Sequence, residues 1–263
     1  MGSFLDTLAG AKIYDLAQTY FVGMPHFPTH PPFLYSLTRE HGEHVGPEGH
    51  SSSADALALG SHCGTHIDAL CHFSLRGKLY GDQAIAQSFG SGQGKYSVDT
   101  IAPILRRGVL LDLARGAGVA ELPVDFEVKP KHLDAAAQGI EIQPGDVVLL
   151  RTGWAAYWSE PARYLAQGRG PGPSLEGAQW LSGRGVFAAG SDTVAFERLP
   201  AETMPVHVHL LVESGIHIIE CLNLEELAAA RVMTFLFVAA PLKIRGATGA
   251  PLRPLALVEA SAR

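Results

Sequence analysis

The stretch HCGTHIDALCH, residues 62–72, places three histidines and an aspartate within eleven positions. His62, His66, Asp68 and His72 all have even numbers, and side chains alternate between the two faces of an extended chain. A helix fits less well, because at about 100° per residue Asp68 falls about 240° from His62. We therefore expect an extended or gently curved segment with these four side chains on one face. The other face would carry Cys63, Thr65, Ile67, Ala69, Cys71 and Phe73.

These residue types are suited to a catalytic metal ion. Three ligands from His62, His66 and Asp68 would leave coordination positions open for water. Gly64 permits a bend and would leave space above the backbone for metal or substrate. His72 could join only if the chain turns after Asp68, either for proton transfer or at a second metal position. The alternative is a group of solvated loop histidines, since the chain has 12 histidines in all.

A second candidate region lies later in the chain, in PVHVHLL from Pro205 and IHIIECLNL from Ile216. In a strand, Glu220 would share a face with Ile216 and Ile218. An isolated buried carboxylate is costly, so Glu220 would be paired, metal-bound or functional. Alternatively, it ends the strand at the surface.

Aromatic side chains could line a substrate pocket. The loop VGMPHFPTHPPFLYSL, residues 22–37, is stiffened by four prolines and carries Phe27 and Phe33. It is either a surface coil packed by its own aromatics or the wall of a pocket for an apolar substrate. Trp154 could also stack on a flat substrate, although most aromatic residues are packing residues.

The composition indicates a large hydrophobic core. Of 263 residues, 47% are hydrophobic and only 17% are charged, against about 25% in typical domains. No repeat or linker divides the chain, so we expect one domain over residues 1–263, and its low charge favours an oligomer. The net charge of −6, without a Lys/Arg cluster, argues against nucleic acid or an anionic membrane as partner.

The cysteines and the apolar segments suggest a cytoplasmic protein. Cys63, Cys71 and Cys221 include no Cys-x-x-Cys pair and suit a reducing compartment. The segment MGSFLDTLAG lacks a basic region and a long apolar run, so no targeting signal is expected. The run VMTFLFVAAPL from Val232 is shorter than the ~20 residues of a membrane-spanning helix.

Apolar runs alternate with helical patterns along the chain. Strands are expected at 13–16, 108–113, 146–151, 186–189, 216–220 and 232–239. Helices are expected at 132–139, 174–183 and 205–215, and after Asn223, which would cap LEELAAAR together with Glu226. This alternation predicts an α/β domain. The glycine-rich GSGQG, residues 90–94, lacks the spacing of a phosphate-binding loop and is expected to be a flexible connection.

Taken together, these motifs resemble the cyclase family of metal-dependent hydrolases, which includes bacterial kynurenine formamidases and isatin hydrolase. The family hallmark H-x-G-T-H-x-D-x-P-x-H is matched by HCGTHIDALCH, except that Leu70 stands where proline is usual. Cys221 replaces the usual asparagine of E-N-L. Further similar stretches are IYDLAQ, GMPHFP, GVLLDL, GDVVLLRTGW, PGPSLEGAQWL, GSDT, IIECLNL, APLKI and PLRPLAL.

The resemblance implies a swivelling β/β/α fold, with a mixed sheet or barrel-like β core and flanking helices, often as a homodimer or homotetramer. It implies one or two divalent ions, Zn²⁺ or Mn²⁺, and hydrolysis of an amide, lactam, ester or lactone in a small aromatic or cyclic molecule. A bound ion would polarise the carbonyl and lower the pKa of its water from ~15.7 towards ~7. The alternatives are a non-enzymatic metal-binding or sensor protein and a polyketide-type cyclase that closes rings. A serine hydrolase is disfavoured because no G-x-S-x-G occurs.

Carried over residue by residue, the resemblance assigns roles in the site. His62, His66 and Asp68 match the metal ligands, and His207 matches the later site histidine better than His209 does. The catalytic residues would be His72 and Glu220, which move the proton of water to the leaving group.

Overall fold

The computed structural model describes residues 8–259 of this chain, so residues 1–7 of MGSFLDTLAG lie outside this range. The strands are β1 (Lys12–Asp15), β2 (Leu34–Arg39), β3 (Ala54–Ala58), β4 (His66–Asp68), β5 (Lys78–Leu79), β6 (Gln83–Ala84), β7 (Gln87–Ser88), β8 (Gly92–Gln93), β9 (Ile104–Asp112), β10 (Glu127–Val128), β11 (Val147–Arg151), β12 (Gly172–Pro173), β13 (Ala188–Ser191), β14 (His217–Glu220), β15 (Thr234–Ala239), β16 (Gly249–Pro251) and β17 (Leu255–Val258).

The helices are α2 (Leu113–Gly116), α3 (Pro130–Ala137), α4 (Pro161–Leu165), α5 (Leu175–Ser182), α6 (Pro205–His207) and α7 (Glu225–Ala229). Short 3-10 helical segments are η1 (Tyr80–Asp82), η2 (Val98–Thr100) and η3 (Trp154–Tyr157), and η4 (Val208–Ser214) is a π-helix.

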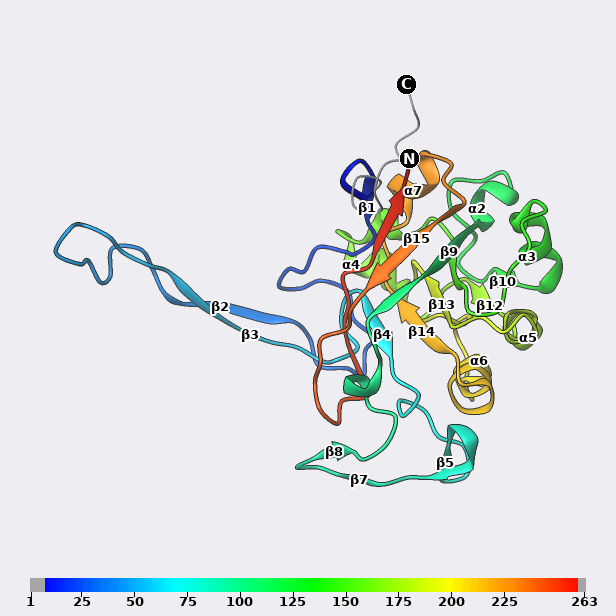
Figure 1. The fold of residues 1–263 in the computed structure, drawn as a ribbon, viewed down its shortest axis with the longest axis horizontal. Helices are drawn as coiled ribbons and strands as arrows, with labels where there is room; N and C mark the ends of the chain where they lie inside the picture. Colours follow the sequence, from blue (N-terminus) through cyan, green and yellow to red (C-terminus); the bar gives the residue numbers. More distant parts are fainter. Residues whose placement is uncertain (1–7, 260–263) are drawn as a thin grey trace.

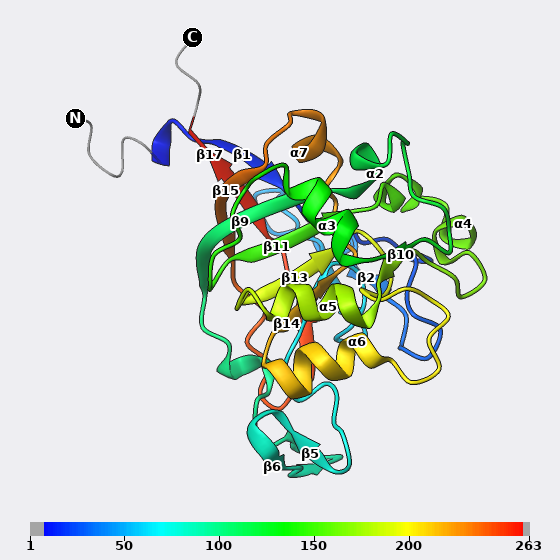
Figure 2. The ribbon, with the colours of Figure 1, turned by 90° about the vertical axis from the view of Figure 1, so that its right-hand side faces the viewer.

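A curled nine-stranded mixed sheet in the order β1-β17-β15-β9-β11-β13-β14-β4-β16 forms the centre of the molecule (Figures 1 and 2). Its four central strands β9, β11, β13 and β14 run parallel, and the outer strands pair antiparallel. Buried parallel strands read as nearly continuous apolar runs, which is why the segments at 108–113, 146–151 and 186–189 were recognisable in the sequence.

Three helices cover one face of this sheet, as Figure 2 shows for α3, α5 and α6. Alternate residues of the strands, such as Val109 and Val148, pack with Leu133, Leu181 and the helix around Leu210 in one core. The intervening residues, Leu110 and Leu149 among them, form a second core on the other face. The prediction of an α/β fold with a mixed sheet and flanking helices is confirmed.

Two expected helices differ in detail. The segment 205–215 begins as α6 but continues as the π-helical η4, which ends at Ser214 and is followed by Gly215 with φ +69°. Helix α7 begins at Glu225 with Leu224 in the N-cap position, so Asn223 is not the cap residue. Its Oδ1 instead accepts a hydrogen bond from the backbone N of Glu225 at 3.4 Å.

The glycine-rich stretch 90–94, expected as a flexible connection, has a defined position in the fold. It forms part of the β7–β8 hairpin, and the backbone N of Gln93 donates to the carbonyl of Gly246 at 2.9 Å. Within residues 8–259, none of the helices combines the length and the apolar character required to cross a bilayer.

Candidate metal centre

The stretch 62–72 is extended only over β4, which carries His66 and Asp68. On either side of β4 the chain changes direction. Gly64 has φ +67°, and the backbone N of His72 donates to the carbonyl of Ala69 at 2.8 Å, which closes a turn after Asp68. The chain therefore turns after Asp68, as His72 requires in order to join the site. As expected, Cys63, Ile67, Ala69 and Cys71 lie in the packed cores. Phe73 was also expected on the packed side but lines the cavity instead, where its ring lies against those of His72 and His207.

Gly64 does permit the expected bend, but the space beside it is not open to metal or substrate. A Cβ at this position would meet the ring of Tyr20 at 2.4 Å. Tyr20 donates its hydroxyl to the carbonyls of Cys63 at 2.7 Å and Thr65 at 2.9 Å. The aromatic ring thus fixes the bend from outside, and the expectation of free space was wrong.

His66 points one ring nitrogen at two carboxylates. Its Nδ1 donates to the carbonyl of Gly64 at 2.8 Å, so the neutral ring carries no proton on Nε2. That Nε2 lies 3.5 Å from Oδ1 of Asp68 and 3.4 Å from Oε2 of Glu220. Glu220 reaches this place because β14 pairs with β4, with Glu220 opposite His66.

His207 approaches the same carboxylates from α6. Its Nδ1 donates to Oε2 of Glu197 at 2.7 Å, and Glu197 also accepts from the backbone N of Val206 at 3.0 Å. Nε2 of His207 lies 3.2 Å from Oε1 of Glu220 and 3.9 Å from Oδ2 of Asp68. Such anchoring of the outer ring nitrogen by a carboxylate is common among metal-binding histidines.

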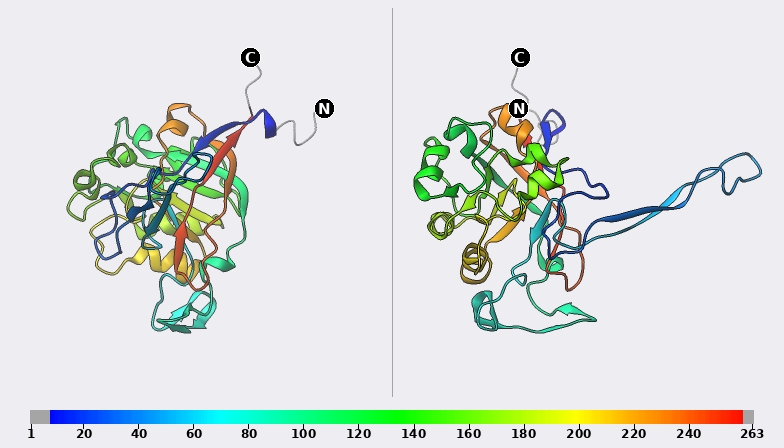
Figure 3. Two further views of the ribbon diagram at one scale, coloured as in Figure 1. Left: turned by 90° about the vertical axis from the view of Figure 1, so that its left-hand side faces the viewer. Right: turned by 180° about the vertical axis from the view of Figure 1, so that it is seen from behind.

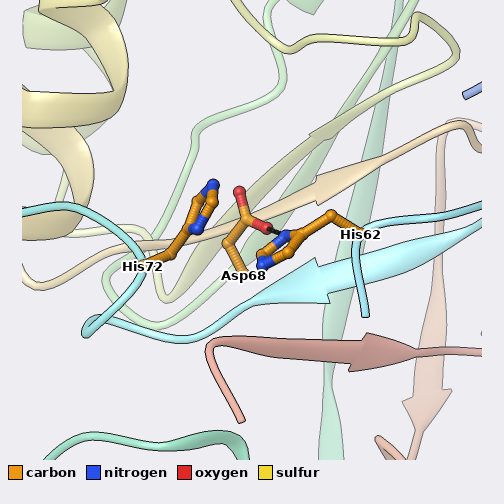
Figure 4. Close-up of side chains that lie close together, drawn as sticks. All are labelled: His62, Asp68 and His72. Atoms are coloured by element: carbon orange, nitrogen blue, oxygen red, sulfur yellow. Dashed lines mark hydrogen bonds and ion pairs between the residues drawn. The ribbon is translucent and has the colours of Figure 1, made fainter. Parts of the chain in front are cut away.

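Figure 4 shows His62 and His72 beside the carboxylate of Asp68. Nδ1 of His62 donates to Oδ1 of Asp68 at 2.6 Å, and its Nε2 lies 2.8 Å from Oγ1 of Thr248. The rings of His62 and His72 are stacked with centroids 3.8 Å apart. Both nitrogens of His62 are therefore engaged, and His62 would bind an ion only by exchanging one of these bonds.

The protonation states reflect this arrangement. Burial disfavours a charged His66 or His207, but the carboxylates beside them outweigh it and raise the pKa of each imidazole to about 10. Burial would likewise raise the pKa of Glu220, yet the hydrogen bond with His207 and the nearby ring of His66 lower it to about 2. For His72, burial dominates and lowers the pKa to about 3, so this ring is neutral at pH 7.

The residues present fit a divalent cation. Nε2 of His66 and Oδ2 of Asp68 are buried and have no hydrogen-bond partner in the described part of the chain. There are two sets of potential ligand atoms, and within each set the atoms lie within 4.8 Å of one another. One set comes from His66, Asp68 and Glu220, and the other from His62, Asp68 and His72. Buried acceptors that face one another are costly unless a positive charge lies between them, and a metal ion supplies that charge.

Not every candidate residue lies at this centre. Phe27 lines the adjoining cavity, whereas Phe33 is packed edge-on against Tyr20 with ring centroids 5.6 Å apart. Trp154 is buried and donates its Nε1 to the carbonyl of Leu122 at 3.0 Å; neither Phe33 nor Trp154 lines the cavity. His209 faces away from the centre and contacts Ser182 and Glu213. Glu220 is only 6% exposed, so the surface alternative was wrong.

Three residues at the centre were missed from the sequence. They are Glu197, His30 and Thr248. Glu197 stands among apolar residues in the sequence. Because an isolated buried carboxylate is costly, the argument made for Glu220 could also have identified Glu197 as a candidate. His30 stands in the proline-rich loop already singled out; its Nδ1 is buried without a partner among the described residues, and its ring lies 5.2 Å from that of His62. Nothing in the sequence points to Thr248.

This chain is similar in sequence and in fold to proteins of one family. The family model "Putative cyclase" matches residues 14–198. Isatin hydrolase from Roseibium aggregatum is 29% identical over 211 residues, which cover 77% of this chain and 73% of that protein. A crystal structure of a novel cyclase superimposes with a TM-score of 0.87 at 27% identity, covering 96% of this chain and 88% of that one. Isatin hydrolase A from Ralstonia solanacearum gives a TM-score of 0.75 at 28% identity, with 98% of both chains covered.

The matched segment includes HCGTHIDALCH and extends over more than half of the sequence. The fold expected from the resemblance is also found in the superimposed structures. The chain therefore belongs to the cyclase family of metal-dependent hydrolases.

Proposed function

We propose that this protein uses one or two divalent ions, Zn²⁺ or Mn²⁺, to hydrolyse an amide, lactam, ester or lactone bond in a small aromatic or cyclic molecule. The observation that carries the proposal is the position of Asp68, shared by two sets of potential ligands beside a cavity of about 210 Å³. The relatives named isatin hydrolase support the choice of substrate class.

The cavity suits a small, flat molecule. Its lining residues are Phe27, Thr29, His30, His72, Phe73, Ala195, Met204, His207 and Glu220. Drug-sized ligands occupy pockets of about 300–1,000 Å³, so a cavity of about 210 Å³ favours a smaller substrate. The aromatic rings of Phe27 and Phe73 offer apolar stacking surfaces, while His72, His207 and Glu220 supply polar groups.

When bound, a divalent ion lowers the pKa of water and polarises a carbonyl group. The chain's own residues would position these groups and move the proton. His72 and Glu220 line the same cavity, where they would be within reach of a bound water and of the leaving group. His66 and His207 would hold the ion through Nε2, because their Nδ1 atoms are already anchored.

The test combines metal analysis with hydrolysis assays. The purified protein is chelated, reloaded with Zn²⁺ or Mn²⁺, and assayed on N-formylkynurenine, isatin and simple aryl lactones. We expect hydrolysis of at least one substrate that disappears on chelation and returns with metal. Asp68→Asn should lower metal content and activity together by at least about 100-fold, whereas Asp134→Asn, a partner of Arg184 away from the centre, should change neither.

Two results would argue against the proposal. Hydrolysis that persists after chelation, or in Asp68→Asn protein without metal, would exclude metal-dependent catalysis at this centre. Stoichiometric metal binding without turnover of any of these compounds, in either the ring-opening or the ring-closing direction, would favour the non-enzymatic metal-binding alternative.

A further inference from the structure

Thr248 contacts a histidine of the metal centre without belonging to either set of potential ligands. Its Oγ1 lies 2.8 Å from Nε2 of His62. The backbone holds it in place, because the backbone N of Ala69 donates to the carbonyl of Thr248 at 2.9 Å. The next residue begins β16, which pairs with β4 at the edge of the large sheet and lies in the red part of the chain in Figure 3. Thr248 is therefore fixed beside the strand that carries Asp68.

Close packing restricts the ring of His62, which is 8% exposed. The ring of His72 stacks on it with centroids 3.8 Å apart. A Cβ on Gly249 would meet Cε1 of His62 at 2.6 Å, so the ring also lies against the backbone of β16. These contacts limit tilting of the ring. They do not distinguish its two orientations related by a half-turn, which exchange nitrogen and carbon atoms at its edges.

Polar partners at the two ring nitrogens select one orientation. Nδ1 of His62 lies 2.6 Å from Oδ1 of Asp68, and Nε2 faces Thr248. After a half-turn, a ring carbon would face each of these oxygens. When an ion binds at Nδ1, that nitrogen gives up its hydrogen, and the hydrogen bond to Asp68 is lost with it. The neutral ring then carries its proton on Nε2, from which the hydroxyl of Thr248 can accept a hydrogen bond.

We propose that Thr248 is a positioning residue of the metal centre: its hydroxyl holds Nε2 of His62, so that Nδ1 faces the ion. His66 and His207 are held the other way round, since their Nδ1 atoms are anchored and their Nε2 atoms face the carboxylates. A hydroxyl suits the place beside His62, because it can donate to Nε2 before the ion binds and accept from Nε2 afterwards. This role of Thr248 depends on the proposed function only through the bound ion.

The contribution of the hydroxyl is measured as Zn²⁺ affinity, by calorimetry on chelated protein. Thr248→Val keeps the shape of the side chain without its hydroxyl and should bind Zn²⁺ about 10–100-fold more weakly. Thr248→Ser keeps the hydroxyl and should bind within threefold of wild type. Thr100→Val is the matched control, because Thr100 donates its hydroxyl to the carbonyl of Ser97 at 2.7 Å and not to a histidine. Its affinity for Zn²⁺ should equal that of the wild-type protein.

Nitrogen-15 NMR of the histidine rings provides a readout that a general loss of stability does not change. In Zn²⁺-loaded wild-type protein, we expect the ring proton of His62 on Nε2 and those of His66 and His207 on Nδ1. In Thr248→Val protein, the Nε2 proton of His62 should exchange faster with solvent because its acceptor is gone. The ring protons of His66 and His207 should exchange as in the wild-type protein.

Three results would overturn the role of Thr248. They are a Zn²⁺ affinity of Thr248→Val within threefold of wild type, a Thr248→Ser variant as weak as Thr248→Val, and a proton of His62 on Nδ1 in the loaded wild-type protein. The last measurement needs no variant to fold. None of these measurements depends on turnover. A protein that shows the expected affinities and ring protons but hydrolyses none of the compounds named above would therefore refute the proposed function and leave the role of Thr248 standing.

Discussion

The most informative perturbation is Glu197→Gln, because Glu197 acts on the centre only through His207. Its carboxylate accepts hydrogen bonds from Nδ1 of His207 at 2.7 Å and from the backbone N of Val206 at 3.0 Å. A glutamine has the same shape but only one accepting oxygen. Whichever way its amide turns, one of these buried N–H groups faces an NH₂ group, and the negative charge beside His207 is lost.

The size of the effect follows from these contacts. Removing a carboxylate that orients a metal-binding histidine typically lowers metal affinity by about 10–100-fold. Leaving one buried donor without an acceptor costs about 1–3 kcal/mol of stability. We therefore expect Glu197→Gln protein to fold, to unfold at lower urea concentration, and to bind Zn²⁺ or Mn²⁺ about 10–100-fold more weakly.

Metal titration by calorimetry after chelation measures the affinity, and urea unfolding of the metal-free protein measures the stability. Glu213→Gln is the matched control, because Glu213 contacts Nδ1 of His209 at 2.8 Å on the same helical stretch but away from the centre. Metal affinity in Glu197→Gln protein within threefold of wild type would refute the positioning role of Glu197.

Three further predictions concern the same centre. His72→Ala should lower activity by about 10²–10⁴-fold with metal retained; activity within threefold of wild type would remove His72 from the mechanism. Gly64→Ala should lower the free energy of unfolding by about 1–3 kcal/mol through its left-handed backbone, and by more because the new Cβ collides with Tyr20. Gly139→Ala is the control, because Gly139 has φ +83° but open space around it, and its stability measured by urea unfolding should fall less. Equal losses of stability in the two variants would contradict the role of Tyr20. Because the carboxylates outweigh burial and raise the pKa of His66 and His207 from 6.5 to about 10, their contribution to the stability of metal-free protein is full below pH 6.5 and lost as the pH rises through about 10. Urea unfolding of chelated protein should show this decline, and a flat or rising profile would count against it.

The local pattern of the sequence determined much of the fold and the position of the site. Apolar runs located the parallel strands of the sheet, since strands buried on both faces must be apolar throughout. The stretch 62–72 drew attention to His62, His66, Asp68 and His72, and the structure gathers the three histidines around the carboxylate of Asp68. The landmark motifs were enough to indicate the family.

The tertiary structure decided what surrounds these residues. Glu197 anchors His207, Thr248 contacts His62, and Tyr20 fills the space beside Gly64. The separation of 186 positions between His62 and Thr248 shows why no local pattern could reveal such a pair. Periodicity reports which face a side chain occupies within its own element, whereas contacts between distant segments depend on how the whole sheet closes.

The β2–β3 hairpin and the three candidate aromatic residues illustrate the same limit. Phe27, Phe33 and Trp154 were equivalent candidates in the sequence, and only the closed fold separated the cavity-lining Phe27 from the two packed rings. In the sequence, the alternating apolar residues around Leu37 and Leu57 could equally have belonged to a covered sheet, but in the structure both leucines are exposed. The sequence determines the chemical group of each residue. Burial and proximity arise from the packing of the entire chain, and they determine which of these groups come into contact.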